Sequence, residues 1–231
     1  VFGLAPMINA AGRMADAGQA VRLMLAQDRV VAAEYSRVLE YRNQLRREYD
    51  LRTFEEADAM PETHDETRRS IVLYGSHWHK GVVGIVASRI VERYYKPAIL
   101  LTHSDGLAVG SARSVAGFDL HAALGQCRDL LKSYGGHAHA AGLSLLPENV
   151  QAFSERFEAV VRQNLSEEDI RRVISVNAEI DLQDITPAFG RVLKQFAPFG
   201  PGNRNPVFVT HQVADTGYSR LLKGDHLDMT D

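Results

Sequence analysis

The 231-residue sequence predicts an α/β protein: a long connecting helix, then an α/β domain with a mixed sheet flanked by helices, then a partial all-β segment. Residues 17–60 contain no proline and repeat apolar side chains at helical spacing. Residues 70–102 follow the pattern strand, helix, strand, which is typical of a parallel βαβ unit. Beyond residue 169 the apolar residues alternate with polar ones and glycine and proline become frequent, as in short strands joined by turns.

The first residues form a small, apolar segment. Pro6 argues against a helix and Gly12 permits a turn, so an irregular segment is predicted. Two interpretations of its polar side chains stay open. Either Asn9 and Arg13 face a site where Arg13 contacts a phosphate, or the segment is the entry to a helix and Arg13 is one of the many arginines that proteins expose. We expect this segment to be the tail of a preceding domain.

A long helix or a pair of helices is predicted from residue 17 to residue 60. Its apolar stripe consists of Val31, Tyr35, Val38, Leu45 and Tyr49. The other faces carry charges of both signs, which favours a solvent-exposed surface with weak ion pairs between residues four apart. Contact of its arginines with nucleic acid is the alternative. The helix is expected to join two domains.

The α/β class follows from the next stretch. Residues 70–74 and 98–102 are apolar, partly β-branched runs that predict buried strands. Between them, residues 82–95 have helical periodicity, and Pro97 ends the helix. A strand, helix and strand in so short a stretch form a crossover that makes the two strands parallel.

Further elements follow along the chain. They are a third strand over 106–112, a helix over 119–133 capped by Asp119, a strand over 143–146, a helix from about 148 to 164, and strands over 173–182 and from 206 to 210. Ligands of open α/β sheets gather at strand ends, so the segments on either side of the 119–133 helix are expected to share one cleft.

Those two segments have the chemistry of phosphate binding. Gly135–Gly142 combines three glycines, two histidines and alanines with no acidic side chain, which leaves backbone N–H groups accessible to an anion. Ser111, Arg113 and Ser114 add hydroxyl donors and a planar guanidinium. A tight turn of buried small residues is the alternative to a phosphate or nucleotide site.

Five motifs support a more specific assignment. They are Pro6–Arg13, Trp78–Arg89, Gly110–Ser114, Gly135–Gly142 and Pro198–Asn203. In this order they resemble the C-terminal portion of the RecJ family of single-strand-specific DNA exonucleases, within the DHH phosphoesterase superfamily. Two departures are Met7, where the family usually has arginine, and Lys80, where proline or an acidic residue is common.

The resemblance implies four parts. They are residues 1–16 as the tail of an upstream DHH catalytic domain, 17–62 as a connecting helical segment, 63–168 as the DHH-associated substrate-binding domain, and 169–231 as part of an OB fold. It also implies a set of residues that bind the substrate and its phosphates: Asn9, Arg13, Ser111, Arg113, Ser114, Gly135, Gly136 and His137. For Phe199 and Phe208, base stacking and ordinary packing both stay open.

The implied reaction is hydrolysis of single-stranded DNA from its 5′ end in recombination and repair, at a two-metal site holding manganese or magnesium. Because the aspartates here are scattered and no Asp-His-His run occurs, we expect that metal site upstream of Val1 and the chain alone to be inactive. Single-stranded DNA is the implied partner, with a single-strand-binding protein and a recombination helicase as candidate protein partners.

Composition limits the remaining possibilities. A formal charge of −3 and a pI near 6.3 mean that nucleic-acid binding must come from a local patch. The single cysteine, Cys127, rules out an internal disulfide and fits a reducing compartment, so we expect the cytoplasm. No apolar run of about 18 residues occurs, and no membrane partner is expected.

Three other interpretations stay open. The pairs His77/His79 and His137/His139 could converge on zinc, although no carboxylate or cysteine clearly completes the set. The chain could belong to a phosphodiesterase for short oligonucleotides or cyclic dinucleotides, which shares the Gly-Gly-His signature but usually lacks an OB tail. It could also be a non-catalytic nucleic-acid-binding or partner-binding module whose glycine-rich segment is only structural.

Overall fold

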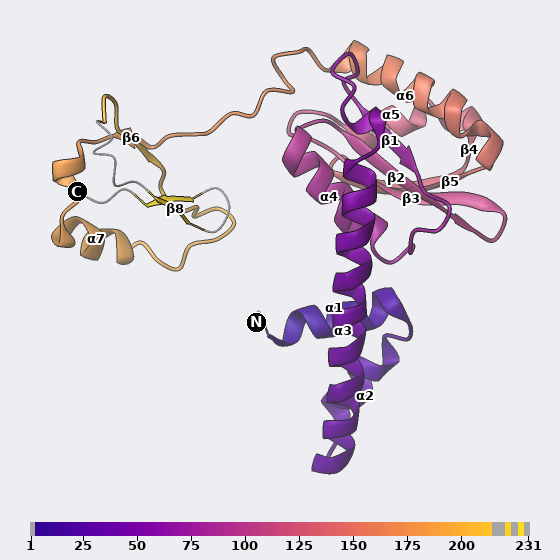
Figure 1. Ribbon diagram of the computed structural model, residues 1–231, viewed down its shortest axis with the longest axis horizontal. Helices are drawn as coiled ribbons and strands as arrows, with labels where there is room; N and C mark the ends of the chain where they lie inside the picture. Colours follow the sequence, from indigo (N-terminus) through magenta and orange to yellow (C-terminus); the bar gives the residue numbers. More distant parts are fainter. Residues whose placement is uncertain (1–2, 214–219, 223–225, 229–231) are drawn as a thin grey trace. The chain divides into compact units, whose positions relative to one another are not determined.

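The computed structural model describes residues 3–213, 220–222 and 226–228. The chain divides into two compact units, residues 1–172 and 173–231, and each is described by itself. Unit 1 contains a helical arm and an α/β domain, and unit 2 contains short strands and one helix (Figure 1). None of the helices in the described part of the chain is long and apolar enough to cross a membrane.

The arm consists of three helices: α1 (Leu4–Met14), α2 (Gly18–Leu25) and α3 (Arg29–Asp58). The prediction that Pro6 prevents a helix in the first residues is wrong, because α1 is helical throughout. Pro6 is the third residue of α1, and backbone N–H groups in the first turn of a helix have no intrahelical acceptor to lose. The 17–60 stretch is indeed a pair of helices.

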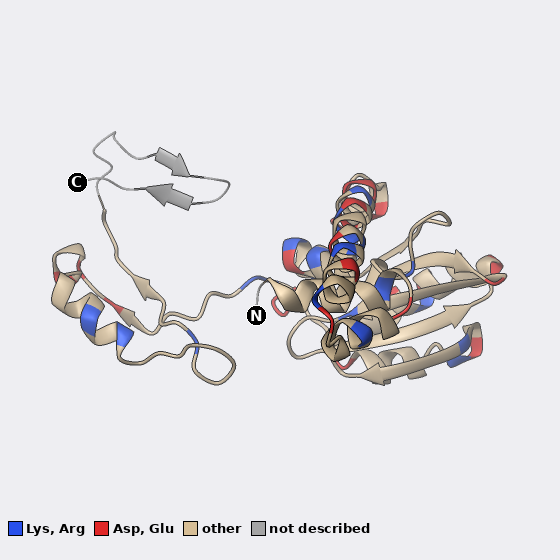
Figure 2. Ribbon diagram, turned by 90° about the horizontal axis from the view of Figure 1, so that it is seen from below, with Lys and Arg blue, Asp and Glu red and all other residues tan. Residues whose placement is uncertain are grey.

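Helix α3 is 30 residues long, but most of its side chains are exposed, with only Leu39, Asn43, Thr53 and Ala57 buried. Asp28 caps its start by accepting hydrogen bonds from Val30 N at 2.8 Å and Val31 N at 3.0 Å. Leu39 packs with α1 and α2, and Ala57 packs with the α/β domain. Figure 2 shows both signs of charge interspersed along α3, as the sequence predicts.

The α/β domain is built on one five-stranded sheet. Its elements are η1 (Pro61–Thr63), β1 (Ile71–Tyr74), α4 (Val83–Tyr94), β2 (Ala98–Ser104), β3 (Leu107–Arg113), α5 (Leu120–Gly125), η2 (Arg128–Leu130), β4 (Leu131–His137), β5 (Ala140–Leu145), η3 (Pro147–Asn149) and α6 (Val150–Asn164). The strand order is β1-β2-β3-β5-β4. Strands β1 and β2 are parallel and the other pairs antiparallel, which confirms the mixed sheet.

One predicted helix is much shorter than expected. Asp119 caps α5 by accepting a hydrogen bond from Ala122 N at 3.0 Å, as predicted, but α5 ends at Gly125 rather than at Ser133. Residues 131–137 instead form β4, whose backbone pairs with β5 along the edge of the sheet. Pairing with the next strand of the same hairpin therefore overrides the local helical pattern, and Gly135 and Gly136 weaken any helix that would continue through them.

The two faces of the sheet are covered unequally. One face packs against α5 and α6 over all five strands, with Ala112, Ala141 and Leu145 in its core. The other face packs against α4 and the end of α3, with Ile71, Ala98 and Leu100 in its core. Those residues belong only to β1 and β2. Helix α4 also contacts β3, where Gly84 lies against Ser111 and Arg113, but none of the described core residues of this face comes from β5 or β4.

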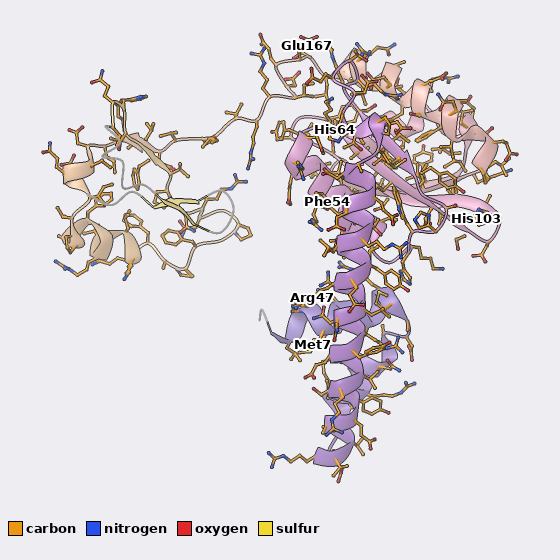
Figure 3. The ribbon with its side chains drawn as sticks, in the orientation of Figure 1. Met7, Arg47, Phe54, His64, His103 and Glu167 are labelled. Carbon is orange, nitrogen blue, oxygen red and sulfur yellow. The ribbon has the colours of Figure 1, made fainter. Side chains whose placement is uncertain are left out.

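A polar joint fixes α3 to the α/β domain. The Glu56 carboxylate lies 2.6 Å from His77 Nε2, accepts a hydrogen bond from Trp78 Nε1 at 2.9 Å, and pairs with Arg52 Nε at 2.9 Å. The Arg89 guanidinium lies 3.8 Å from the centre of the Phe54 ring, where α3 meets the domain (Figure 3). Hydrogen bonds, mainly from Arg52 and then from Trp78 and His77, lower the pKa of Glu56 to about 2.

We therefore expect Glu56 to make stability depend on acid. The folded-state pKa is depressed, so this stabilisation is present above the ordinary value of 4.5 and is lost as the pH falls towards about 2. Urea unfolding of wild type and Glu56→Gln should show a gap in the free energy of unfolding at pH 6 that shrinks between pH 4.5 and pH 2. A gap that stays constant with pH would contradict the assignment.

A buried carboxylate fixes the start of the sheet. Glu158 of α6 accepts hydrogen bonds from the backbone N–H of Arg69 and Ser70, each at 2.9 Å, and from Ser70 Oγ at 2.6 Å. Two arginines also pair with it: Arg162 of the same helix, whose Nε lies 2.7 Å away, and Arg68, whose Nε lies 3.8 Å away. The carboxylate thus satisfies backbone donors where the chain enters β1, far from α6 in sequence.

Removing Glu158 should be costly. Glu158→Ala leaves two backbone N–H groups and a guanidinium without their acceptor, and we expect the free energy of unfolding to fall by about 3 kcal/mol. Glu155→Ala removes the same charge from the exposed side of α6 and should change stability by less than about 0.5 kcal/mol. Denaturant unfolding of both variants checks the difference, and equal losses would contradict it.

Unit 2 is described by β6 (Ala178–Glu179), η4 (Leu182–Asp184), α7 (Pro187–Lys194), β7 (Phe208–Val209), β8 (Arg220–Leu222) and β9 (His226–Asp228). The predicted half-buried strand over 173–182 is reduced to the two residues of β6, and Val176 and Leu182 are exposed. Helix α7 was not predicted. Phe208 of β7 packs edge-on against Phe189 of α7 at 5.4 Å, which favours packing over base stacking for this ring.

Candidate functional site

A cleft of about 950 Å³ opens on the incompletely covered face of the sheet. One wall is formed by the end of α1 and the start of α4, and the other by the exposed faces of β3, β5 and β4. The lining residues with polar side chains are Arg13, Lys80, Ser88, Ser104, Asp105, Ser111, Arg113, Ser133 and Ser144. Five of these are serines, one on α4 and four on the strands, so hydroxyl groups line both walls of the cleft.

The charge of the cleft is mainly positive. Arg13, Lys80 and Arg113 line it, whereas Asp105 is its only acidic residue. Within the described part of the chain, no carboxylate lies within 4 Å of any of these three cations, although eleven such pairs occur elsewhere. The cleft therefore concentrates positive charge in a protein whose formal charge is −3.

Arg113 is held by neutral groups. Its Nη1 donates hydrogen bonds to Ser111 Oγ at 2.7 Å and to the Ala112 carbonyl at 2.8 Å. Burial lowers the pKa of the Arg113 guanidinium, and the charge of Arg13 lowers it further. An anion in the cleft would relieve both effects, because it would replace lost hydration and offset the repulsion between the two arginines.

Close packing sets the position of each arginine. A methyl group on Gly84 of α4 would lie 3.0 Å from Arg113 Nη2 and 3.0 Å from Ser111 Oγ, so glycine gives these side chains their room. A methyl group on Gly81 would fall on the Arg13 carbonyl, so the backbone before α4 touches the end of α1. Arg13 thereby reaches the cleft from a different part of unit 1.

The structure brings only three of the predicted site residues into the cleft lining, namely Arg13, Ser111 and Arg113. Asn9 is exposed on α1 but does not line the cleft. The Ser114 hydroxyl is used within the fold, where it donates to the Phe118 carbonyl at 2.9 Å. The Ser114 N–H also donates to the His139 carbonyl at 3.1 Å, which fastens the end of β3 to the β4–β5 turn.

Gly135, Gly136 and His137 lie beside the cleft lining rather than in it. The register pairs Arg113 with Ala140 and Ala140 with His137, and it pairs Ser111 with Gly142 and Gly142 with Gly135. The two predicted segments thus occupy the same rows of the sheet, two strand spacings or about 10 Å apart. The expected loop is instead a hairpin, whose turn lies between His137 and Ala140.

The two neighbouring glycines have different surroundings. Gly136 has a φ of +147°, and a methyl group there would clash with the Ala140 carbonyl and the Ala141 Cα. Gly135 has open space where its methyl group would be. The hairpin therefore requires glycine at position 136, whereas the backbone geometry offers no such reason at position 135.

This contrast gives a test of the glycine pair. Gly136→Ala should lower the free energy of unfolding by about 1 kcal/mol or more, because the side chain meets backbone on the neighbouring strand. Gly135→Ala should change it by less than about 0.5 kcal/mol. Thermal unfolding of both variants checks this order, and equal losses would show that the hairpin geometry is wrong.

Sequence reasoning missed part of the α4 wall. Gly81, Gly84, Ile85 and Ser88 line the cleft at positions i, i+3, i+4 and i+7, which is one face of a helix. This spacing was readable in the sequence, because Gly81, Gly84 and Ser88 recur at intervals of three and four residues at the start of the predicted helix, where the residues between them are apolar. Ser133 and Ser144, whose Oγ atoms lie 2.7 Å apart across β4 and β5, carried no such signal.

A metal site has no support among the described residues. No three His, Cys, Asp or Glu side chains there gather closely enough to hold a metal ion. His77 pairs with Glu56, and His79 stacks on Tyr49 with ring centres 5.3 Å apart. His137 contacts His139 at the hairpin instead, at 6.0 Å between rings. The alternative of a four-histidine zinc site therefore finds no support among the described residues.

Comparison with known proteins identifies both units. Residues 68–163 match the model of the DHHA1 domain, and residues 176–230 match that of the RecJ OB domain. A single-stranded-DNA-specific exonuclease RecJ from Bacillus subtilis is 36% identical over 99% of this chain, and the one from Thermus thermophilus is 34% identical over 98%. The crystal structure of RecJ from Thermus thermophilus in complex with Mn²⁺ aligns with 99% of this chain at 31% identity and a TM-score of 0.85.

The chain spans about a third of the length of these relatives. It covers 30% of the Bacillus subtilis protein, 32% of the Thermus thermophilus protein, and 34% of the chain in the crystal structure with Mn²⁺. A crystal structure of exonuclease RecJ bound to manganese matches 74% of this chain, with 34% identity, a TM-score of 0.66 and 42% coverage of that structure.

Proposed function

Because this chain belongs to the RecJ family and contains its DHHA1 and OB domains, we propose that it is the substrate-binding portion of a 5′ to 3′ single-stranded-DNA exonuclease acting in recombination and repair. The observation that carries the proposal is the cleft beside α4, where no carboxylate of the described residues lies within 4 Å of Arg13 or Arg113. Phosphates of a DNA strand supply the negative charge that this cleft lacks.

The cleft residues act by binding and orienting. Arg113 offers its remaining guanidinium donors to phosphate oxygens, while Ser111 holds it in place through the hydrogen bond of 2.7 Å. Arg13 adds charge from the opposite wall. Such prearranged donors need little reorganisation when the strand binds, so they can fix the position of a scissile bond. His137 and Gly135, in the same sheet rows, extend this surface towards the hairpin.

The hydrolytic step belongs to the whole protein. Two manganese or magnesium ions, held by residues outside this chain, would activate water and stabilise the departing oxygen. We therefore propose that residues 1–16 end the catalytic domain, 17–62 connect it, 63–168 bind substrate and 169–231 form an OB domain. This chain alone should not hydrolyse DNA. Its proposed setting is the cytoplasm, with a single-strand-binding protein and a recombination helicase as protein partners.

The proposal predicts a specific loss of DNA binding. Arg113→Ala should weaken binding of a labelled single strand about tenfold and lower the slope of log K against log salt by about 0.7, the effect of one lost phosphate contact. Arg113→Lys should restore part of the affinity. Fluorescence anisotropy at two salt concentrations, with single-stranded and duplex probes, measures both quantities.

Arg156→Ala is the matched control. It removes the same charge from α6, on the other face of the sheet, where Arg156 is half exposed beside Asp129. Its binding should match wild type. Unchanged binding by a folded Arg113→Ala protein would refute the role of the cleft, and an equal loss in both variants would indicate only a change in overall charge.

A further inference from the structure

Lys80 is the cleft cation to which the proposed function gives no role. It lies between β1 and α4, its side chain is exposed, and it lines the cleft beside Arg13 and Gly81. No carboxylate of the described residues lies within 4 Å of its ammonium group, as the full set of ion pairs shows. A cation just before a helix start also faces the positive end of the helix dipole.

Folding therefore gives no reason for a lysine at this position. Its charge is close enough to His79 to lower the pKa of that imidazole, after burial, which is the larger cause. Arg13 lies on the same side of the cleft, where its carbonyl touches Gly81. Lys80 thus adds positive charge to an already positive region, and a bound anion would offset the resulting repulsion.

The backbone that carries Lys80 is fixed on both sides. Trp78 is buried, its Nε1 donates to Glu56 at 2.9 Å, and its carbonyl accepts from Thr102 Oγ1 at 2.6 Å. His79 stacks on Tyr49 and its Nδ1 accepts the Gly81 N–H at 3.0 Å. A rigid base with a long, free side chain suits an anchor that reaches a ligand without reorganising the fold.

Lys80 and Arg113 lie beside different residues at the start of α4. Arg113 packs against Gly84, whereas Lys80 precedes Gly81, which packs against α1. The volume of about 950 Å³ is near the upper limit of small-molecule pockets and far exceeds what one phosphate needs. The cleft thus has room for two anionic groups, one near Arg113 and one near Lys80.

We propose that Lys80 binds a second phosphate of the same strand, so that this cleft recognises a nucleotide with a phosphate on each side rather than a single phosphate group. The inference rests on the proposed function, because it assumes that the ligand is a DNA strand. Lys80 is a positioning residue here, since it contacts no reacting bond.

Competition against a labelled thymidine oligonucleotide tests the inference. The competitors are thymidine 5′-monophosphate, with one phosphate, and 5′-phosphorylated dithymidylate, with two. Wild type should favour the dinucleotide. Lys80→Ala should reduce that preference about fivefold and change the half-inhibitory concentration of the monophosphate less than about twofold. Lys80→Arg should keep the preference, because it retains the charge and the donors.

The control is Lys132→Ala, which removes the same charge from an exposed position on β4 outside the cleft lining. It should keep the wild-type preference. The inference is overturned if Lys80→Ala weakens both competitors equally, weakens neither, or matches Lys132→Ala. Failure of the proposed function looks different: the wild-type chain would then bind neither the labelled strand nor either competitor, and both proposals would fall together.

Discussion

One helix, α4, is too narrow to cover one face of a five-stranded sheet. It packs on the parallel pair β1 and β2, where Ile71, Ala98 and Leu100 supply large or well-fitted apolar contacts. The strands beyond carry mostly small or polar side chains on that face, such as Ser111, Arg113, Ser133 and Ser144, together with the partly exposed Leu107 and Val109. The opposite face, with α5 and α6 over every strand, holds the fold together. The uncovered half is thus free to bind a ligand.

The electrostatics of unit 1 follow the same division. Where stability matters, charges are paired: Glu158 satisfies the entrance to β1, and Glu56 fastens α3 to the domain. In the cleft, Arg13, Lys80 and Arg113 remain without acidic neighbours within 4 Å among the described residues. Ion pairs are common elsewhere in the described part of the molecule. The requirements of folding stability therefore do not explain why these three cations lack acidic partners.

The sequence pattern correctly predicted the elements whose structure is decided by neighbouring residues in the chain. The periodicity of residues 82–95 and the apolar runs around it gave α4, β1 and β2 within about two residues, because each buries its apolar side in a regular way. The prediction from Pro6 was wrong because proline breaks a helix only in its interior, and Pro6 lies in the first turn of α1. Residues 131–133 became part of β4 because β5, the next strand of the hairpin, supplies their hydrogen-bond partners, and helical periodicity in the sequence does not show this pairing. The cleft serines were missed for the same reason.

The contact between Gly81 and the Arg13 carbonyl has a mechanical meaning. Arg13 belongs to α1, which packs on α3 near Leu39, while the part of α3 that contacts the domain is its last third, from Tyr49 to Asp58. Helix α3 is about 45 Å long and contacts the domain at its C-terminal end, so a change in its tilt moves the helices packed along it. A tilt of a few degrees there would shift Arg13 by about an ångström relative to Arg113. The distance between Arg13 and Arg113 across the cleft therefore depends on the contacts that hold α3 to the domain and on the contact between Gly81 and the Arg13 carbonyl.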